Sequence, residues 1–505
     1  MTTASTAGEG RRVRPTTYLV FFALFALALA ATHLSMLGLP FHWDELGQFV
    51  PSALDLWRDG AWVPHSAPPN PHPPGVMAYL AGVWSIFGYS IEATRAAMLL
   101  VASLAMLAAF LLAIELGRDA PGAPAFAAAV FLMASPVFFS QAVMAQLDMP
   151  AMLFTSLALL WFVQERLGLA VAASAALAMT KETGLLVPLV FAAWLVRERR
   201  YRDASLFLIP AVPLAAWLGV VEHATGHLFG NAAFTEYNLF YPLHPVRLGM
   251  ALVRRLHYLF LADFHWVGTA ALIYAWRRTG LFRSRAWKVA WLLLAAHSIA
   301  VTVMGGAVLE RYLLPVLPVL YSGMAAAMMF PRPWLRGTAV AALALGLAAG
   351  NFWNPPYPFP HENNLAWTEM VRLHREAAGF VQVRYPGTRI ATAWPLSGAL
   401  TRPDFGYADQ PLAVEELPDL LPRTVEAIDW NRTPVLVLFS RSPEAQTGPY
   451  RSQWVRALWQ RYWGWEPDIE PWEIRRRLPV TLVARWSRRE QWVEIYKKRG
   501  WFPTP

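Results

Sequence analysis

The sequence contains no cysteine, and only four of its 43 basic residues are lysine. Without cysteine there is neither a disulfide nor a thiolate metal site, which fits an oxidising cell envelope. Charged residues make up only 15% of the 505 residues, against about 25% in soluble globular proteins. So little charge cannot cover a water-facing surface of normal size, which excludes a large soluble protein. The sequence also lacks an internal repeat and a Gly-rich phosphate loop.

Apolar residues dominate instead: 56% of the chain is hydrophobic and the mean hydropathy is +0.33. This composition predicts an integral membrane protein. The first uncharged stretch, from Pro15 to Trp43, is too long for a signal peptide and indicates a signal anchor after a tail of residues 1–14. Charge-free runs predict eleven spans, near residues 16–38, 93–115, 122–141, 149–164, 167–180, 183–196, 204–221, 259–276, 288–308, 312–331 and 337–352.

The distribution of basic residues predicts the orientation of these spans. Sixteen basic residues fall in one set of connections and seven in the other, so we expect a cytoplasmic N-terminus and a C-terminus outside. The larger set is Arg11, Arg12, Arg14, Arg118, Arg166, Arg197, Arg199, Arg200, Arg202, Arg277, Arg278, Arg283, Arg285, Lys288, Arg332 and Arg336. The smaller set is Arg58, Arg95, Lys181, Arg247, Arg254, Arg255 and Arg311.

The region 167–196 decides on which side of the membrane the later connections lie, because it holds either one long helix or a hairpin of two short ones. A single helix would place Lys181 and Glu182 at mid-membrane and the basic cluster 197–202 outside. Two arms of about 14 residues each would span roughly 21 Å of a 30 Å core. We therefore expect a hairpin whose charged tip lies below the outer surface, where charge usually lines a cavity.

The chain changes character after Gly350. Residues 351–505 hold 20 of the 43 basic residues and no further span. Three runs in this part predict strands, near 389–394, 434–439 and 480–485, between Pro-rich loops and charged helical stretches. The predicted fold is thus an α-helical membrane domain over 15–350, followed by a soluble α/β domain on the outer side.

Two predicted outer loops are long. Loop 39–92 carries Asp44-Glu45, a Pro-rich run, and an amphipathic stretch over 76–87 that we expect to lie along the membrane surface. Loop 222–258 contains Glu236.

Acidic and basic residues at the outer ends of spans are the candidates for chemistry. Asp44-Glu45 suits general-base work, or stabilises the start of a loop helix. Lys181 suits a lipid phosphate, with Glu182 moderating the cost of its burial, or it snorkels or forms a structural ion pair. Asp148 serves as a helix cap before Pro150, as a functional residue, or as both. Arg311 binds phosphate or anchors a span at the interface.

Weaker candidates of the same kind are His72, Arg95, Glu236 and His265. His42, His65 and His72 share one loop, but no ligand spacing supports a metal site there. Acid and base facing a membrane-borne group indicate group transfer from a lipid phosphate, with basic residues stabilising the leaving phosphate.

Together these motifs resemble the polyprenyl-phosphate-sugar-dependent GT-C glycosyltransferases, in particular the protein O-mannosyltransferase and lipid A aminoarabinose transferase group. The resemblance covers about residues 15–330, and its specificity lies in the order and side of the motifs. They are Asp44-Glu45, Ala53-Leu54, Gly60-Ala61-Trp62, His72-Pro73-Pro74-Gly75, Glu92-Ala93-Thr94-Arg95, Leu147-Asp148-Met149-Pro150, Thr180-Lys181-Glu182-Thr183-Gly184 and Arg311-Tyr312-Leu313-Leu314-Pro315.

The resemblance implies roles for these residues. Asp44, with Glu45, would be the general base that deprotonates an acceptor hydroxyl, which attacks the anomeric carbon with inversion. Lys181 would bind the donor phosphate, assisted by Arg311, Tyr312 and His72. Asp148, Glu236 and Arg95 would contact substrate. The family often has lysine at the position of His72, so a fixed positive charge is not assured there.

The implied partners are a polyprenyl-phosphate sugar, membrane lipids and an acceptor protein, lipid or glycan in the envelope, with no nucleic acid. No cofactor is firmly implied, although a divalent cation is compatible. Two other classes stay open: a transporter or lipid flippase, and a non-catalytic envelope assembly protein whose tail binds partners. Pseudo-symmetric halves and midplane charges would favour a transporter, but the charges cluster at one face.

Overall fold

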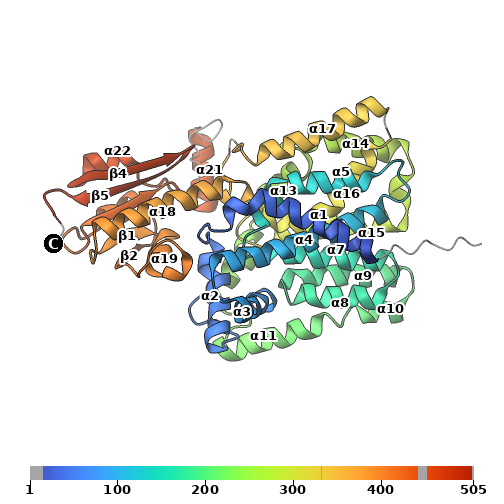
Figure 1. The fold of residues 1–505 in the computed structure, drawn as a ribbon, viewed down its shortest axis with the longest axis horizontal. Helices are drawn as coiled ribbons and strands as arrows, with labels where there is room; N and C mark the ends of the chain where they lie inside the picture. Colours follow the sequence, from blue (N-terminus) through green and yellow to red (C-terminus); the bar gives the residue numbers. More distant parts are fainter. Residues whose placement is uncertain (1–14, 331, 356, 442–451, 503–505) are drawn as a thin grey trace, which may run out of the picture.

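The computed structural model describes residues 15–502, apart from 331, 356 and 442–451. Helices packed side by side form one end of the molecule, and a small sheet with its own helices forms the other (Figure 1). The change falls after α17 (Pro333–Gly350), where the sequence predicted it.

Each predicted apolar segment coincides with a helix or with two helices separated by a short break. Some breaks fall at proline, which removes a helical hydrogen bond; α5 ends at Ala134, two residues before Pro136. The helices are α1 (Pro15–His33), α4 (Ile91–Leu116), α5 (Pro124–Ala134), α6 (Pro136–Gln141), α7 (Asp148–Val163), α8 (Leu167–Ala178), α9 (Leu186–Arg197), α10 (Tyr201–Leu206), α11 (Ala211–Thr225), α13 (Pro245–Phe260), α14 (His265–Arg278), α15 (Arg285–Val303), α16 (Leu317–Met328) and α17.

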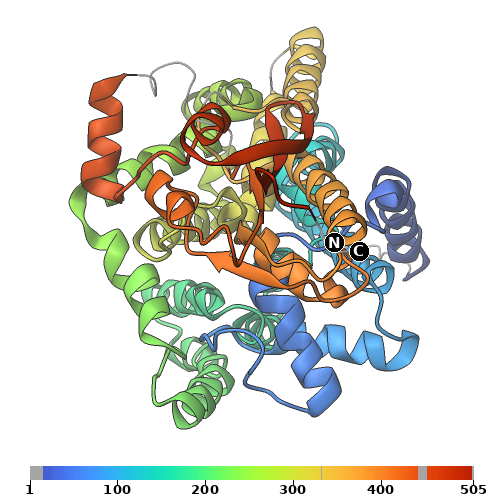
Figure 2. The same ribbon diagram turned by 90° about the vertical axis from the view of Figure 1, so that its left-hand side faces the viewer.

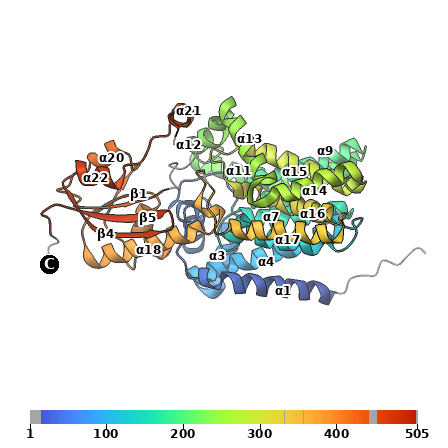
Figure 3. The same ribbon diagram turned by 90° about the horizontal axis from the view of Figure 1, so that it is seen from above.

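The helices differ in how much of their surface is buried in the common core. Every residue of α16 is buried, and α4 buries residues along its whole length against α1, α5 and α7. By contrast, α1 buries only Leu29 and His33 and lies along the outside of the bundle beside α4 (Figure 3). Such an apolar yet exposed helix is typical of a lipid-facing position.

Among the described residues, four helices are long and apolar enough to cross a membrane. They span Pro15–Met36, Ile91–Leu116, Tyr201–Thr225 and Arg285–Val303. A fifth results if Pro245–Phe260 and Ala262–Arg278, which meet at 45°, form one broken span. The remaining described helices are shorter or less apolar, so the count of eleven spans stays a prediction, as does the orientation.

The predicted hairpin at 167–196 is confirmed as two helices. α8 and α9 are joined by a turn that contains Lys181 and the 3₁₀ helix η3 (Glu182–Leu185). The amphipathic stretch near 76–87 forms α3 (Gly75–Phe87). The π-helical turn η2 (Glu45–Phe49) and α2 (Val50–Asp59) precede it at the same end of the bundle (Figure 1).

The C-terminal domain is built on a five-stranded sheet in the order β2-β1-β3-β5-β4. β1 pairs parallel with β2 and β3, whereas β5 pairs antiparallel with β3 and β4. The three predicted strands are confirmed as β1 (Ile390–Ala393), β3 (Val435–Phe439) and β4 (Val480–Arg488), and β2 (Val414–Leu417) and β5 (Gln491–Lys498) complete the sheet. Its helices are α18 (Ala366–Arg384), α19 (Leu396–Thr401), α20 (Pro422–Glu426), α21 (Gln453–Trp463) and α22 (Pro471–Arg477).

The C-terminal domain lies over the end of the bundle (Figure 2). Direct hydrogen bonds fix it there. The Tyr407 hydroxyl donates to the carbonyl of Phe41 at 2.7 Å, and the Phe41 amide donates to the carbonyl of Phe405 at 3.3 Å. Arg58 forms an ion pair with Asp404 at 2.8 Å. These contacts reach the loop that carries Asp44.

Candidate active site

A cavity of about 780 Å³ lies where the bundle meets the C-terminal domain. Its wall combines distant parts of the chain: residues 42–44 and 48–49, 71–72, 147–148, 181–183, 233–234 and 237–239, 304–305, and 359–362. The start of the 3₁₀ helix η8 (Glu310–Val316) adds Arg311 and Tyr312. Of the predicted site residues, the cavity thus brings together Asp44, His72, Asp148, Lys181, Arg311 and Tyr312.

Asp44 stands at an unusual point of the backbone. Trp43, just before it, has a positive φ of 45°, a conformation that bulky residues rarely adopt. The π-helical turn η2 follows directly, and such turns are frequent at functional sites. The Asp44 side chain makes no cap to that turn; it forms an ion pair with Arg311 and keeps 26% of its surface exposed. Asp44 is therefore held by a cation but open to the cavity.

Arg311 is the most crowded charge of the site. Its side chain is only 3% exposed, so it is not an interfacial anchor. Besides Asp44, its Nε atom lies 3.5 Å from Asp148 Oδ2 and 3.2 Å from Glu362 Oε1. It also donates to the side-chain carbonyl of Gln146. Three carboxylates therefore surround one guanidinium.

Lys181 does not snorkel to the surface, because its side chain is 12% exposed and its Nζ atom lies 2.6 Å from Asp148 Oδ1. The same Nζ atom lies 4.3 Å from the centre of the Tyr312 ring, a cation–π distance. Asp148 is the first residue of α7 but caps nothing; its carboxylate joins Lys181 to Arg311 instead.

Glu182 does not pair with Lys181, which corrects the expectation from the sequence. Its carboxylate accepts a hydrogen bond from His72 Nδ1 at 2.8 Å. Burial raises the pKa of Glu182, but His72 and Lys181 outweigh it and bring that pKa to about 2. The ionised Glu182 carboxylate therefore fixes the His72 side chain at the cavity wall.

The other acidic residue of the pair, Glu45, does not reach the cavity. It is fully buried and accepts hydrogen bonds from the amides of His42 and Ala145, at 2.8 and 2.7 Å. Arg95 completes this buried cluster, 3.4 Å from Glu45, and donates to the carbonyls of Leu39, Pro40 and Val143. Successive side chains of a helical turn point about 100° apart, so Glu45 faces inward where Asp44 faces out.

Two more candidates also lie away from the cavity wall. Glu236 is exposed in the π-helical turn η4 (Glu236–Phe240), while its neighbours Tyr237 and Asn238 line the cavity. His265 is buried in the bundle and bonds the carbonyl of Tyr258 and the Tyr321 hydroxyl.

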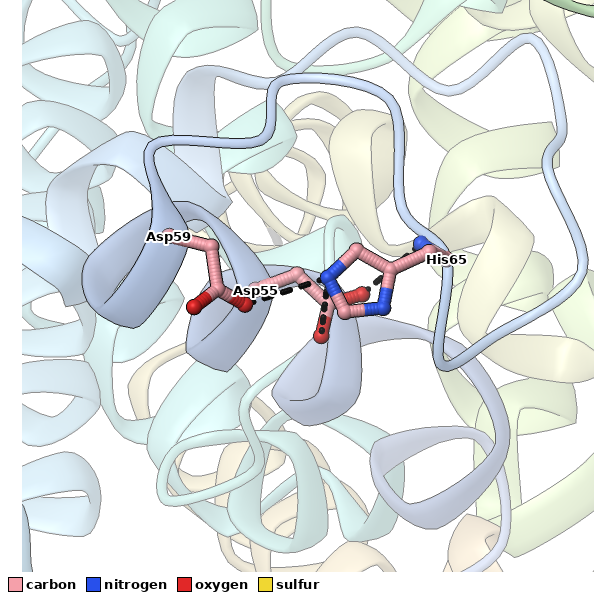
Figure 4. A group of neighbouring side chains, drawn as sticks. All are labelled: Asp55, Asp59 and His65. Carbon is pink, nitrogen blue, oxygen red and sulfur yellow. Dashed lines mark hydrogen bonds and ion pairs between the residues drawn. The ribbon is translucent and has the colours of Figure 1, made fainter.

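The three histidines of the first loop do not share one metal site, because His65 contacts Asp55 and Asp59, whereas His72 contacts Glu182. Asp55, Asp59 and His65 are the one group of three such side chains, within the described part of the chain, whose ligand atoms lie close enough for one ion (Figure 4). Asp55 already accepts hydrogen bonds from the amides of His65 and Ser66 and from the Ser66 hydroxyl, at 2.7–2.9 Å. Asp55 therefore anchors the loop after α2, which accounts for the proximity of these three side chains without a metal ion.

Sequence reasoning missed the contribution of the C-terminal domain. Glu362 and His361 line the cavity from the 3₁₀ turn η9 (His361–Asn363), and Asn363 donates to Glu310 at its edge. Gln146, beside Asp148, was missed as well. The signal was present: a polar run, His361 to Asn364, follows the last span at the end where the other candidates lie.

Solved structures match this arrangement, although no known family model and no curated protein matches the sequence. The crystal structure of ArnT from Cupriavidus metallidurans bound to undecaprenyl phosphate agrees with a TM-score of 0.55, covering 95% of this chain and 98% of ArnT at 16% identity. The protein has the ArnT fold. ArnT in the apo state gives a TM-score of 0.54 at the same coverage and identity. The oligosaccharyltransferase AglB from Archaeoglobus fulgidus is more distant, with a TM-score of 0.46 at 11% identity over 95% of this chain and 74% of AglB.

ArnT is a lipid A aminoarabinose transferase of the GT-C superfamily. The predicted resemblance is thus confirmed at the level of the fold: a helical bundle followed by a small sheet domain. The roles of individual residues stay predictions.

Proposed function

We propose that the protein is a membrane glycosyltransferase that moves a sugar from a polyprenyl-phosphate-linked donor to a hydroxyl acceptor, with inversion. One observation carries the proposal: an accessible carboxylate, Asp44, shares a single cavity with the paired cations Lys181 and Arg311. The fold supports it, because ArnT with this fold was crystallised with undecaprenyl phosphate. The acceptor is a protein, lipid or envelope glycan.

Asp44 is the general base in this proposal. Its carboxylate takes the proton of the acceptor hydroxyl while the oxygen attacks the anomeric carbon of the sugar. The bond between that carbon and the phosphate oxygen breaks, and polyprenyl phosphate leaves with the electron pair. The ion pair with Arg311 fixes the direction of the Asp44 carboxylate before the acceptor arrives.

The leaving phosphate needs positive charge as its bond breaks. Lys181 and Arg311 supply it, and both are held in place by Asp148. The Tyr312 ring packs against both cations, 4.3 Å from Lys181 and 5.6 Å from the Arg311 guanidinium, and keeps them turned to the cavity. His72, held by Glu182, lines the same cavity.

Glu45 and Arg95 act indirectly in this proposal. Their buried ion pair ties the loop at 39–42 to α4 and to the Ala145 amide, and thereby positions Asp44. The predicted topology places the cavity and the C-terminal domain on the outer face, where lipid-linked donors are consumed. A transporter is not favoured, because the charged residues that line the cavity lie together at the end of the bundle that faces the C-terminal domain.

The glycans of a strain that lacks the gene test this proposal. We expect one glycan, glycolipid or glycoprotein of the envelope to lose one sugar by mass spectrometry, and the native gene to restore it. A strain with the Asp44→Asn gene should keep the defect at equal protein level. An unchanged envelope in the deletion strain would contradict the proposed activity.

A further inference from the structure

The C-terminal domain places one carboxylate in the cavity. Glu362 is 4% exposed; its Oε1 atom lies 3.2 Å from Arg311 Nε, and its Oε2 atom accepts a hydrogen bond from the Gln146 amide at 3.1 Å. It comes from the turn η9, outside the bundle and outside the motifs that carry the family resemblance. The proposed transfer reaction does not use it.

The charges around Glu362 do not balance. Three carboxylates, Asp44, Asp148 and Glu362, share the two cations Arg311 and Lys181. If all are ionised, the cluster carries one surplus negative charge. A donor phosphate beside the same two cations adds a second one in a site of low dielectric, where like charges repel strongly.

The other titratable groups of the cavity leave this surplus in place. Arg441 is paired with Asp468, and Glu182 with His72. Burial lowers the pKa of His361 to about 4 and that of His42 well below its usual value, so both imidazoles are neutral near pH 7.

Glu362 can change its charge near neutral pH. Burial raises the pKa of Glu362, and although Arg311 lowers it, Asp44 and Asp148 raise it further, to about 7. Another negative charge nearby raises the pKa again. At neutral pH, an anion entering the cavity therefore favours a proton on Glu362.

We propose that Glu362 compensates the charge of the donor: it takes up one proton from solvent when the phosphate binds beside Lys181 and Arg311, and releases it when the phosphate leaves. The inference rests on the proposed function, because it takes the bound anion to be the donor phosphate. Neutral Glu362 still accepts from Gln146 and leaves Arg311 to Asp44, Asp148 and the phosphate. Donor binding is thereby coupled to pH.

Titration calorimetry with the full-length protein in nanodiscs tests this coupling. The probe is farnesyl methyl phosphate, a diester that keeps one negative charge over the pH range used. Repeating the titration in buffers of different ionisation enthalpy gives the number of protons taken up. We expect close to one proton at pH 8, and an affinity about tenfold weaker at pH 8 than at pH 6.

The variant Glu362→Gln keeps the shape of the side chain but cannot titrate. It should take up no proton and bind the probe equally well at pH 6 and pH 8, whereas Glu426→Gln, at an exposed surface ion pair, should behave like the native protein. Binding without proton uptake by the native protein, or an unchanged pH dependence in Glu362→Gln, would overturn the inference alone. The native proton count needs no variant, so it decides even if Glu362→Gln does not fold. If neither protein binds the probe at any pH, the proposed donor itself is wrong.

Discussion

At the scale of single residues, the charged side chains of the site share their ion-pair partners. Arg311 holds Asp44 while touching Asp148, and Asp148 in turn holds Lys181. Arginine suits the central position because its planar fork binds several oxygens at fixed angles, which lysine cannot do. A change at one member therefore alters the direction of the others.

Lys181→Gln should weaken donor binding more than it slows the chemical step. The amide still reaches Asp148 but carries no charge for the phosphate, and a charge-assisted hydrogen bond is worth about 1.5–3 kcal/mol. We expect the KM for the lipid donor to rise about 10- to 100-fold, measured by steady-state kinetics. Lys288→Gln, at an exposed lysine outside the cavity, is the matched control. An unchanged KM in Lys181→Gln would remove Lys181 from the donor site.

Sequence reasoning could reach six residues of the cavity wall, because they lie near span ends on one predicted side: Asp44, His72, Asp148, Lys181, Arg311 and Tyr312. It could not tell that Asp44 faces the cavity and Glu45 does not, since the direction of a side chain within a turn depends on local backbone geometry. It also missed Glu362, because a residue of a separate domain joins the site only through tertiary packing. Arg95 was predicted to contact the substrate, but its guanidinium donates hydrogen bonds to three backbone carbonyls instead.

At the scale of elements, the segment before η2 depends on the buried pair Glu45 and Arg95. Both side chains are fully buried, and the Arg95 guanidinium lies between the rings of Phe41 and Trp367, 5.4 and 5.3 Å from their centres. Trp367 belongs to α18, so this pair also ties the C-terminal domain to α4. Hydropathy predicted where these helices lie, but it carries no information on such polar junctions.

Arg95→Met should destabilise the protein strongly, because it leaves the Glu45 carboxylate buried without its cation. Removing one partner of a buried ion pair costs about 3–5 kcal/mol. Thermal unfolding in detergent should show a lower Tm, and adding Glu45→Gln should recover part of the loss. If the double variant is no more stable than Arg95→Met, the ion pair is not the reason.

At the scale of the whole molecule, the C-terminal domain closes the cavity and steadies the loop that carries Asp44. Tyr407→Phe removes its 2.7 Å hydrogen bond to the Phe41 carbonyl, three residues before Asp44. We expect a loss of about 1 kcal/mol in stability and a lower kcat with little change in KM. Tyr201→Phe, at an exposed tyrosine far from this contact, should change neither quantity, and equal kinetics in both variants would contradict a positioning role for this contact.

The most direct test of the central claim follows the lipid donor itself. Membranes containing the native protein or Asp44→Asn are incubated with polyprenyl-phosphate-linked sugars, and released polyprenyl phosphate is measured by mass spectrometry. General-base catalysis contributes about 10²- to 10⁴-fold, so we predict release with the native protein and a loss of that size with Asp44→Asn, while donor binding persists. Equal release by both proteins would contradict the account.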